Sequence, residues 1–377
     1  MKKKCLIIFG TRPEAIKMAP LVKEFDKHKD LLETRVCITA QHREMLDQVL
    51  EFFEITPDYD LDVMQPGQNL YDLTAVILKK AKAVLESFKP DFVFVHGDTT
   101  TTMAASLAAF YFGAKVCHVE AGLRTHNLRS PFPEEMNRSV TGIVTNLHFA
   151  PTEQSRKNLI EENKDINTIF VTGNTVIDAL LYSAKKVKHP DFRDPEIEYL
   201  KSLIQNVSKL ILVTGHRREN HGQGFINICK ALKKLAIENP ETMIIYPVHL
   251  NPKVQQPVYE LLDDVSNIKL ISPLSYPAFI WLMEKSYLII TDSGGVQEEA
   301  PSLGKPVLVM RDTTERPEAV EAGTVILVGT DEAKIIEETN RLLKNENNYA
   351  EMSKRHNPYG DGKASGRIAN EILAQKD

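Results

Sequence analysis

Residues 95–138 decide the fold, and they read VHGDTTTTMAASLAAFYFGAKVCHVEAGLRTHNLRSPFPEEMNR. Two short apolar runs, residues 92–95 and 115–119, have the length and composition of buried strands. Each run delivers a carboxylate at or just past its carboxyl end, Asp98 and Glu120. Ligands of open parallel α/β sheets bind at that edge. Charges placed there, followed by a loop punctuated with Gly and Pro, indicate a functional site.

The same alternation of apolar runs and amphipathic stretches continues along the chain. Strands are expected at residues 6–9, 34–39, 92–95, 115–119, 147–150, 169–171, 210–213, 243–248, 268–271, 288–291, 306–310 and 325–328. Strands that alternate with helices predict βαβ units and parallel sheets. These are too many for one comfortable doubly wound sheet, and residues 174–206, a helix and then a charged segment with prolines, form the natural bridge. We therefore expect an α/β protein of two doubly wound (Rossmann-like) parallel-sheet domains facing a central cleft, in preference to a (β/α)₈ barrel.

Composition excludes several classes of function. The 377 residues suffice for two buried cores, and the apolar content of 42 % is ordinary for a globular protein. A net charge of −5 without a long basic block disfavours nucleic-acid binding. No apolar run approaches the roughly 18 residues of a membrane span. The four cysteines lie inside apolar runs without metal spacing, which indicates reduced core thiols of a cytoplasmic protein.

A second group of polar strand ends predicts an anion site. Ser293, Gly294 and Gly295 follow a strand and open a helix, whose free backbone N–H groups can hold a phosphate. Glu299 lies in the same helix and could accept hydrogen bonds from ribose hydroxyls. Cationic and imidazole side chains follow other strand ends: Arg12, Lys17, His216, Arg217, Arg218, His249, Arg311 and Arg316. Such a set of donors makes a diphosphate the expected ligand.

Signals for other nucleotides and for metals are weak. Gly10-Thr11-Arg12-Pro13-Glu14 stands after the first strand where a dinucleotide site would have GxGxxG, so no nicotinamide or flavin cofactor is expected. Residues 303–306 (LGKP) lack the Ser or Thr of a Walker A loop. The D-x-D pattern of residues 58–62 resembles that of metal-dependent glycosyltransferases, but we interpret it as a solvated loop and expect no metal site.

The chain resembles the non-hydrolysing UDP-N-acetylglucosamine 2-epimerases. The matching stretches are GTRPEAIKMAP (10–20), QHREMLDQ (41–48), HGDTTTT (96–102), HVEAGLRT (118–125), PFPEEMNR (131–138), TGHRREN (214–220) and TDSGGVQEEAPSLGKPVLVMRDTTERPE (291–318). The resemblance implies a glycosyltransferase-B-like fold, a homodimer, and reversible conversion of UDP-GlcNAc to UDP-ManNAc without an added cofactor. It also implies an N-terminal domain (1–173) with most catalytic carboxylates, a UDP-binding domain (174–360), and a last helix in 361–377 that crosses back to the first domain.

Site residues carried over from the family match this sequence position by position. The implied catalytic residues are Asp98, Glu120, Glu134 and His216. The implied nucleotide-sugar contacts are Arg12, Lys17, His249, Phe279, Ser293, Gly294, Gly295, Glu299 and Arg316. Some members bind UDP-GlcNAc at a second, regulatory site, which would here involve Gln41, His42 and Gln68. The family's Arg–Gln pair reads Gly67-Gln68 in this chain, which weakens the expectation of allosteric activation.

The chemistry of the reaction accounts for these groups. Carbon 2 has no neighbouring carbonyl to stabilise a carbanion, so elimination of UDP to a 2-acetamidoglucal and re-addition is the expected route. That route needs cations for the diphosphate, clustered carboxylates for proton transfer, and a site closed to water. The sequence does not say which carboxylate takes the proton and which returns it. The product would supply ManNAc for cell-surface polysaccharide.

Other interpretations remain open for the function and for some residues. A hydrolysing 2-epimerase, a glycosyltransferase of the same fold and a catalytically silent nucleotide-sugar sensor are the alternatives. Glu135 is expected to pair with Arg138 across one helical turn. His118 alternates with apolar residues, so we expect a hydrogen-bonded core histidine, whereas His96 could be structural or functional.

Overall fold

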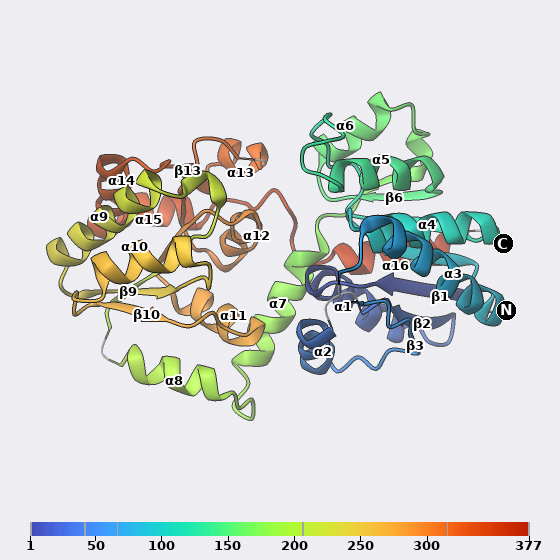
Figure 1. Ribbon diagram of the computed structural model, residues 1–377, viewed down its shortest axis with the longest axis horizontal. Coiled ribbons are helices and arrows are strands. Elements are labelled where there is room, and N and C mark those ends of the chain that lie inside the picture. The colour runs from blue at the N-terminus through green and yellow to red at the C-terminus, as the bar shows by residue number, and fades with distance from the viewer. Residues whose placement is uncertain (1, 41–42, 66, 206, 315, 376–377) are drawn as a thin grey trace. The chain divides into compact units, whose positions relative to one another are not determined.

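The computed structural model describes residues 2–40, 43–65, 67–205, 207–314 and 316–375. The chain forms two compact units, one of Met1–Ala179 with Tyr359–Asp377 and one of Leu180–Pro358 (Figure 1). Each unit is built on a sheet in which the paired strands run parallel, with helices in the crossovers. The prediction of two doubly wound α/β domains is therefore confirmed.

The first unit has, within the described ranges, a seven-stranded sheet of order β3-β2-β1-β4-β5-β6-β7. Its strands are β1 (Lys3–Phe9), β2 (Leu32–Ile38), β3 (Tyr59–Asp60), β4 (Phe92–His96), β5 (Lys115–Val119), β6 (Leu147–Ala150) and β7 (Ile169–Val171). The order reverses between β1 and β4, so the loops that follow these two strands lie at the topological switch point. Ligands of doubly wound sheets bind at such points.

The helices of this unit are α1 (Arg12–Asp26), α2 (Arg43–Phe52), α3 (Leu70–Phe88), α4 (Thr100–Phe112), α5 (Glu134–Val144), α6 (Glu153–Glu161), the 3-10 turn η1 (Ile166–Thr168) and the C-terminal α16 (Ala364–Ala374). Helix α7 (Thr175–Val187) leads from this unit into the next. Helix α4 shows how the sequence sets the ends of a helix. The Thr99 hydroxyl accepts from the Thr102 N–H at its start, and Gly113 ends it at φ 91°.

Helix α16 packs against α1 and is fastened at both ends. The carboxylate of Asp178 accepts hydrogen bonds from the N–H groups of Ala364 and Ser365 at 3.1 and 2.8 Å. At the other end Lys3 Nζ donates to the carbonyl of Ile372 at 2.9 Å. An anion at the start and a cation at the end also match the helix dipole.

The second unit has, among its described residues, a six-stranded sheet of order β10-β9-β8-β11-β12-β13. Its strands are β8 (Lys209–Thr214), β9 (Thr242–Pro247), β10 (Ile268–Ile271), β11 (Leu288–Thr291), β12 (Val307–Val309) and β13 (Val325–Leu327). Its helices are α8 (Pro195–Leu203), η2 (Arg218–Asn220), α9 (Gln223–Glu238), α10 (Pro252–Leu262), α11 (Tyr276–Lys285), α12 (Gly294–Glu299), η3 (Ala300–Leu303), α13 (Pro317–Glu321), α14 (Glu332–Lys344) and α15 (Glu346–Ser353). The order reverses between β8 and β11, where the loops with His216 and Ser293 begin.

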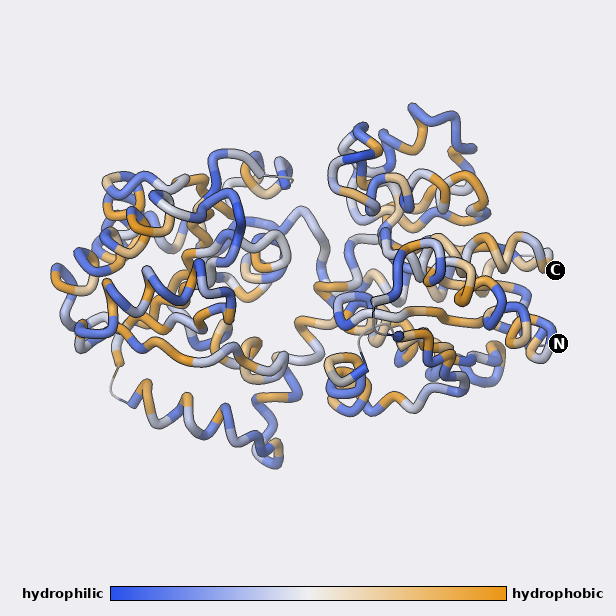
Figure 2. The backbone as a smooth tube through the Cα atoms, in the orientation of Figure 1, coloured by the Kyte–Doolittle hydropathy of each residue, from blue (hydrophilic) through white to orange (hydrophobic). Residues whose placement is uncertain are grey.

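The buried hydrophobic residues of each unit lie largely in its strands and helices. Figure 2 shows the hydropathy of each residue along the backbone, with hydrophobic residues in orange. Loops at the carboxyl ends of the strands are free to carry polar side chains because they contribute little to these cores. The predicted strand at residues 34–39 begins two residues earlier, at Leu32, and the other predicted strands differ at their ends by three residues or fewer. Across the described residues, no helix is both long and apolar enough to cross a membrane.

The prediction of a solvated loop at residues 58–62 was wrong in part. Tyr59 and Asp60 form β3, which extends the sheet beside β2. Arg43 binds the carboxylates of Asp60 and Asp62 at 2.8 and 3.0 Å. The D-x-D pattern therefore fixes α2 to the edge of the sheet.

Candidate active site

Two carboxylates of the first unit lie on turns that depart from ordinary backbone geometry. Strand β4 leads through Gly97, at φ 66°, to Asp98, and β5 leads directly to Glu120, at φ 64°. A side chain with a Cβ rarely adopts positive φ, and doing so costs on the order of 1 kcal/mol or more. Such a backbone conformation at the end of a central strand is typical of a functional residue.

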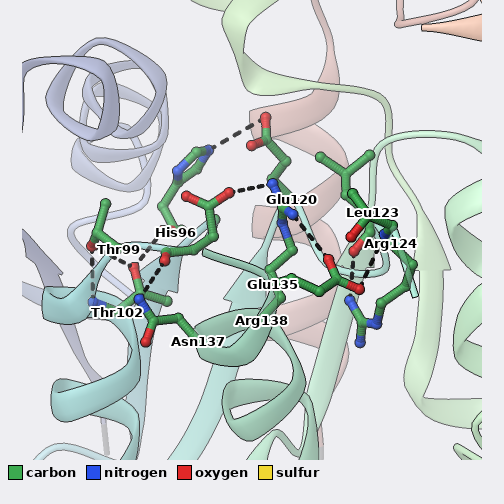
Figure 3. Close-up of polar contacts among 12 residues, drawn as sticks. His96, Thr99, Thr102, Glu120, Leu123, Arg124, Glu135, Asn137 and Arg138 are labelled. Carbon is green, nitrogen blue, oxygen red and sulfur yellow. Dashed lines mark hydrogen bonds and ion pairs between the residues drawn. The ribbon is translucent and has the colours of Figure 1, made fainter. Parts of the chain in front are cut away.

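Three polar groups from separate elements surround one oxygen of Glu120. Lys17 Nζ of α1 forms an ion pair with Oε2. Asn174 Nδ2 donates to the same oxygen at 2.8 Å. His96 Nε2 lies 3.8 Å from this oxygen (Figure 3). The Glu120 side chain is 8 % exposed, so its negative charge is compensated by protein groups rather than by water. This arrangement supports the ionised form of Glu120, which suits a base.

Asp98 is held differently. Burial raises the pKa of Asp98, the ion pair with Arg138 opposes that rise, and the charges of Glu120 and Glu134 add to it. Asn137 Nδ2 also donates to the Asp98 carbonyl at 2.8 Å and so fixes this turn to α5. Two carboxylates in such different surroundings have the properties of an acid beside a base.

Glu134 and Glu135 begin α5 and have different environments. Glu134 is half-buried, and its charge reaches Asp98. Glu135 is 1 % exposed and accepts from the backbone N–H groups of Thr125 and His126, each at 3.0 Å. It also pairs with Arg138 at 3.1 Å, so the predicted structural role of Glu135 is confirmed.

The two histidines next to the carboxylates are buried. His118 is 1 % exposed, and its Nε2 lies 2.8 Å from the Gly97 carbonyl, which confirms the predicted hydrogen-bonded core histidine. His96 is 3 % exposed, and its Nε2 is a buried atom without a hydrogen-bond partner among the described residues. Burial lowers the pKa of His118 to about 3 and that of His96 to about 4, so both rings are neutral near pH 7.

Glu14 is a buried carboxylate that our sequence reasoning missed. It is 2 % exposed, and its Oε2 accepts from the N–H groups of Gly10 and Thr11 at 3.0 and 2.8 Å. Its Oε1 accepts from the hydroxyls of Thr99 and Thr102 at 2.6 and 3.0 Å. It therefore joins the turn after β1 to the turn after β4. Its capping-box spacing, Thr11 followed three residues later by Glu14, was the available signal.

In the second unit, a buried aspartate organises the loop after β8. Asp292 is fully buried and accepts from the N–H groups of His216 and Arg217, each at 2.9 Å, and from Asn220 Nδ2 at 3.2 Å. The His216 ring stacks on that of His249 with centroids 5.2 Å apart. Burial lowers the pKa of His216, an effect that Asp292 opposes and His249 reinforces.

Two guanidinium groups lie at the start of α12. A methyl group placed on Gly294 would contact Arg316 Nη2 at 3.6 Å and Arg217 Nη2 at 3.8 Å. Arg316 is oriented by an ion pair with buried Glu298, and Arg217 has a buried Nε without a hydrogen-bond partner in the described part of the chain. Guanidinium donors that converge on a glycine at the start of a helix form a suitable binding site for an anion.

Glu299 ends the same helix and lies near its first turn. A methyl on Gly295 would lie 3.8 Å from Glu299 Oε2 and 4.0 Å from the Ser293 hydroxyl. Ser293 is the residue before the helix, and its side chain makes no capping hydrogen bond to it. The structure thus brings together Ser293, Gly294, Gly295 and Glu299 of one stretch of sequence with Arg316, which follows the next strand.

The remaining predicted site residues are placed as follows. Arg12 is half-buried at the start of α1, Phe279 is half-buried on α11, and Gln68 is half-buried after Gly67, which has φ 72°. Gln41 and His42 lie outside the described residues. Within the described ranges, no group of three His, Cys, Asp or Glu side chains is arranged to hold a metal ion.

Comparisons with known proteins agree on one family. The sequence profile of the family described as UDP-N-acetylglucosamine 2-epimerase matches residues 23–373. The chain is 58 % identical to the UDP-N-acetylglucosamine 2-epimerase of Campylobacter jejuni, over 100 % of this chain and 99 % of the relative. It is 60 % identical to that of Escherichia coli K12, over 97 % of both chains. Its fold matches the crystal structure of the Neisseria meningitidis UDP-GlcNAc 2-epimerase bound to UDP-GlcNAc with a TM-score of 0.88 and 54 % identity, over 99 % of this chain and 100 % of that one.

Proposed function

Because the chain belongs to the UDP-N-acetylglucosamine 2-epimerase family of isomerases, we propose that it interconverts UDP-GlcNAc and UDP-ManNAc. The observation that carries this proposal is the pair of buried carboxylates after β4 and β5, one paired with Lys17 and one with Arg138. Inversion of a carbon centre needs a proton removed on one face and returned on the other. A transferase has less use for clustered carboxylates, and a silent sensor has no need to keep acid–base groups.

The proposed reaction is an elimination followed by an addition. A base removes the proton of carbon 2, and the C–H electron pair forms the double bond between carbons 1 and 2. The C1–O bond breaks at the same time, and UDP leaves with its electron pair. A proton is then delivered to the other face of carbon 2 while UDP adds back to carbon 1.

We assign Glu120 as the base and Asp98 as the acid in the direction from UDP-GlcNAc. Lys17 and Asn174 both donate to Glu120 and support its charged form. Burial and the neighbouring Glu134 raise the pKa of Asp98 and so favour a carboxyl group that carries a proton. In the reverse direction the two roles exchange. Each group contributes about 10²–10⁴ to the rate.

The second unit supplies the groups for the diphosphate. Arg217, Arg316 and the backbone at Gly294 provide donors, and the buried Asp292 holds His216 in the same loop as Arg217. Removal of one such donor from the transition state costs about 3 kcal/mol. Glu299 is assigned to the ribose hydroxyls, Phe279 to the uracil, and Arg12 and His249 to further contacts with the nucleotide sugar.

Proton NMR of the protein with UDP-GlcNAc in D₂O tests the proposal. We expect UDP-ManNAc with deuterium at carbon 2, and a rate at least 100-fold lower for E120Q and D98N. E153Q, an exposed glutamate of α6, serves as the control and should retain the native rate. Free ManNAc with UDP would indicate a hydrolysing enzyme. Tight binding of UDP-GlcNAc with no change in the sugar would refute the epimerase assignment and leave a transferase or a sensor.

We also propose a homodimer. Helices α3 and α4 expose Tyr71 (88 %), Phe110 (56 %) and Tyr111 (74 %). A groove between the two helices is lined by Leu78, Leu85, Ala108, Tyr111 and Phe112, together with the charged residues Lys79, Lys82 and Glu86. Large exposed aromatic side chains beside an apolar groove are typical of an interface. Sedimentation should give a dimer for the native chain and a monomer for Tyr111→Glu, whereas a native monomer would contradict the assignment.

Three further assignments follow from the family. We propose a cytoplasmic enzyme that supplies ManNAc units for cell-surface polysaccharide, which fits four buried, unpaired cysteines. We propose weak or no activation by a second UDP-GlcNAc, because Gly67 stands where the family's pair has Arg. A kinetic curve without sigmoidal dependence on UDP-GlcNAc is the expected result.

A further inference from the structure

His96 is a buried polar group beside the carboxylates to which no role has been assigned so far. Its ring is 3 % exposed at the end of β4, and its Nε2 faces Glu120 Oε2 at 3.8 Å (Figure 3). That distance is too long for a hydrogen bond, and Nε2 finds no other partner in the described part of the chain. A buried ring nitrogen left unpaired costs about 1–3 kcal/mol, so its retention calls for an explanation.

The protonation state of the His96 ring explains why Nε2 and Glu120 Oε2 lie too far apart for a hydrogen bond. The backbone of His96 itself favours a proton on the ring, and Nε2 is the ring nitrogen without a hydrogen-bond partner in the described part of the chain. We assign the ring proton to Nδ1, which leaves a lone pair on Nε2. A lone pair and a carboxylate oxygen have no proton to share, so the two atoms stay apart while Glu120 is charged.

The situation changes once Glu120 has taken up a proton. A buried carboxyl O–H must donate to an acceptor. Lys17 Nζ and Asn174 Nδ2, which both contact Oε2, are donors. The amide oxygen of Asn174 is occupied by the N–H of Val176 at 3.0 Å. Nε2 of His96 is an acceptor that faces this oxygen at 3.8 Å, and rotation of the carboxyl group about its soft, two-fold last torsion can bring either oxygen to it.

We propose that His96 is a positioning residue whose Nε2 accepts a hydrogen bond from Glu120 whenever Glu120 holds the proton of carbon 2. His96 thereby stabilises the protonated Glu120 of the intermediate and not the charged form of the resting enzyme. It keeps its own proton on Nδ1 throughout, so no net transfer to the ring occurs. The inference rests on the proposed epimerase reaction and on the assignment of Glu120 as base.

Several other charged and titratable groups among the described residues act on this pair or on Asp98 beside it. Lys17 of α1 favours the charged form of Glu120, and His118 of β5 is a neutral neighbour of His96. Asp98 interacts with Glu120, and Glu134 and Arg138 act on Asp98. These groups are unchanged in His96 variants, so a change in the pH profile of a variant reports on the contact between His96 and Glu120.

Two substitutions of matched polarity separate this role from a structural one. In His96→Gln the side-chain oxygen reaches about as far as Nε2 and can accept, whereas in His96→Asn the amide ends near the position of Nδ1. We expect H96N to lower kcat about 10- to 100-fold with KM within about twofold. The acidic limb of its kcat–pH profile should move to lower pH, because Glu120 without its acceptor binds a proton less tightly. H96Q should retain most of the native kcat, and the acidic limb of its kcat–pH profile should lie at the native pH.

Two further measurements make the test decisive. In an E120Q background, H96N should cause no additional loss, since the amide of the E120Q variant takes up no proton. His148 of β6 is also buried, with an unpaired Nδ1, so H148Q controls for the loss of a buried imidazole and should leave the limb unmoved. Equal kcat and pH profiles for H96N and H96Q would overturn the inference while the native enzyme still epimerises. Absence of epimerisation by the native chain would instead refute the proposed function.

Discussion

Substitution of Gly294 by alanine tests the diphosphate site without disturbing the fold. Gly294 is the first residue of α12 and has no left-handed backbone, so a side chain is allowed. The added methyl would lie 3.6 Å from Arg316 Nη2 and 3.8 Å from Arg217 Nη2, which are ordinary contacts. Because alanine is a better helix former than glycine, by up to about 1 kcal/mol, the Tm of G294A should not fall.

We expect the G294A variant to bind the diphosphate of UDP more weakly. A phosphate oxygen bonded to a guanidinium lies about 2.8 Å from its nitrogen, in the space beside Gly294 that the methyl would take. Hydrogen bonds to charged groups contribute about 1.5–3 kcal/mol each. Loss of one of them corresponds to about 10- to 150-fold weaker UDP binding, and loss of two to more.

Calorimetric titration with UDP, together with a thermal melt, measures both effects. Gly366→Ala in α16 is the control, because its methyl meets nothing closer than Glu24 Oε1 at 3.9 Å. G366A should bind UDP with the native Kd. A G294A protein with the native Tm and the native Kd would refute the placement of the diphosphate at α12.

Three other changes have clear expected results. Asp178→Ala removes the acceptor at the start of α16 and should cost about 2 kcal/mol, lowering the Tm by about 4–8 °C in calorimetry, whereas D178N keeps an acceptor oxygen and should lose less. Lys17→Met leaves Glu120 without its cation, so the acidic limb of the kcat–pH profile should move to higher pH, opposite to H96N. The buried histidines of β4, β5 and β6 have pKa values of about 4, 3 and 4, so the unfolded chain binds more protons below pH 6.5. The free energy of unfolding should therefore decrease as the pH is lowered from about 6 to about 4, by about 1.4 kcal/mol per pH unit for each histidine. In H148Q this free energy, measured by chemical denaturation, should depend less steeply on pH.

The fold could be predicted from the sequence because its strands are buried on both faces. Each central strand is an apolar run between turn signals, and this pattern gives the strand positions almost directly. The edge strand β3 was missed for the same reason. Its residues, Tyr59 and Asp60, are half-buried and exposed, and β3 exists only through its pairing with Cys37 and Ile38 of β2. No periodicity marks such a strand.

The partners of the site residues could not be predicted in the same way. Asp98 and Glu120 were found because each follows a strand. The donor to Glu120 from Asn174 is 54 residues away, and the hydroxyl of Thr99 bonded to Glu14 is 85 residues away. Such contacts depend on which strands are neighbours, and the order of the strands is not written in local patterns. Asn174 also follows a strand, β7, so a search of every strand end would have included it.

The backbone at Glu120 connects the local strand pattern with the long-range contacts of the site. Positive φ at a glutamate is unfavourable, and a glycine there would adopt the turn without strain. The strain persists because Lys17 and Asn174 bind the carboxylate from two different segments of the chain and hold it after β5. The position is therefore determined by the carboxylate and not by the turn. A residue that costs stability where it stands, and that the rest of the unit is built to hold, is the residue on which the chemistry depends.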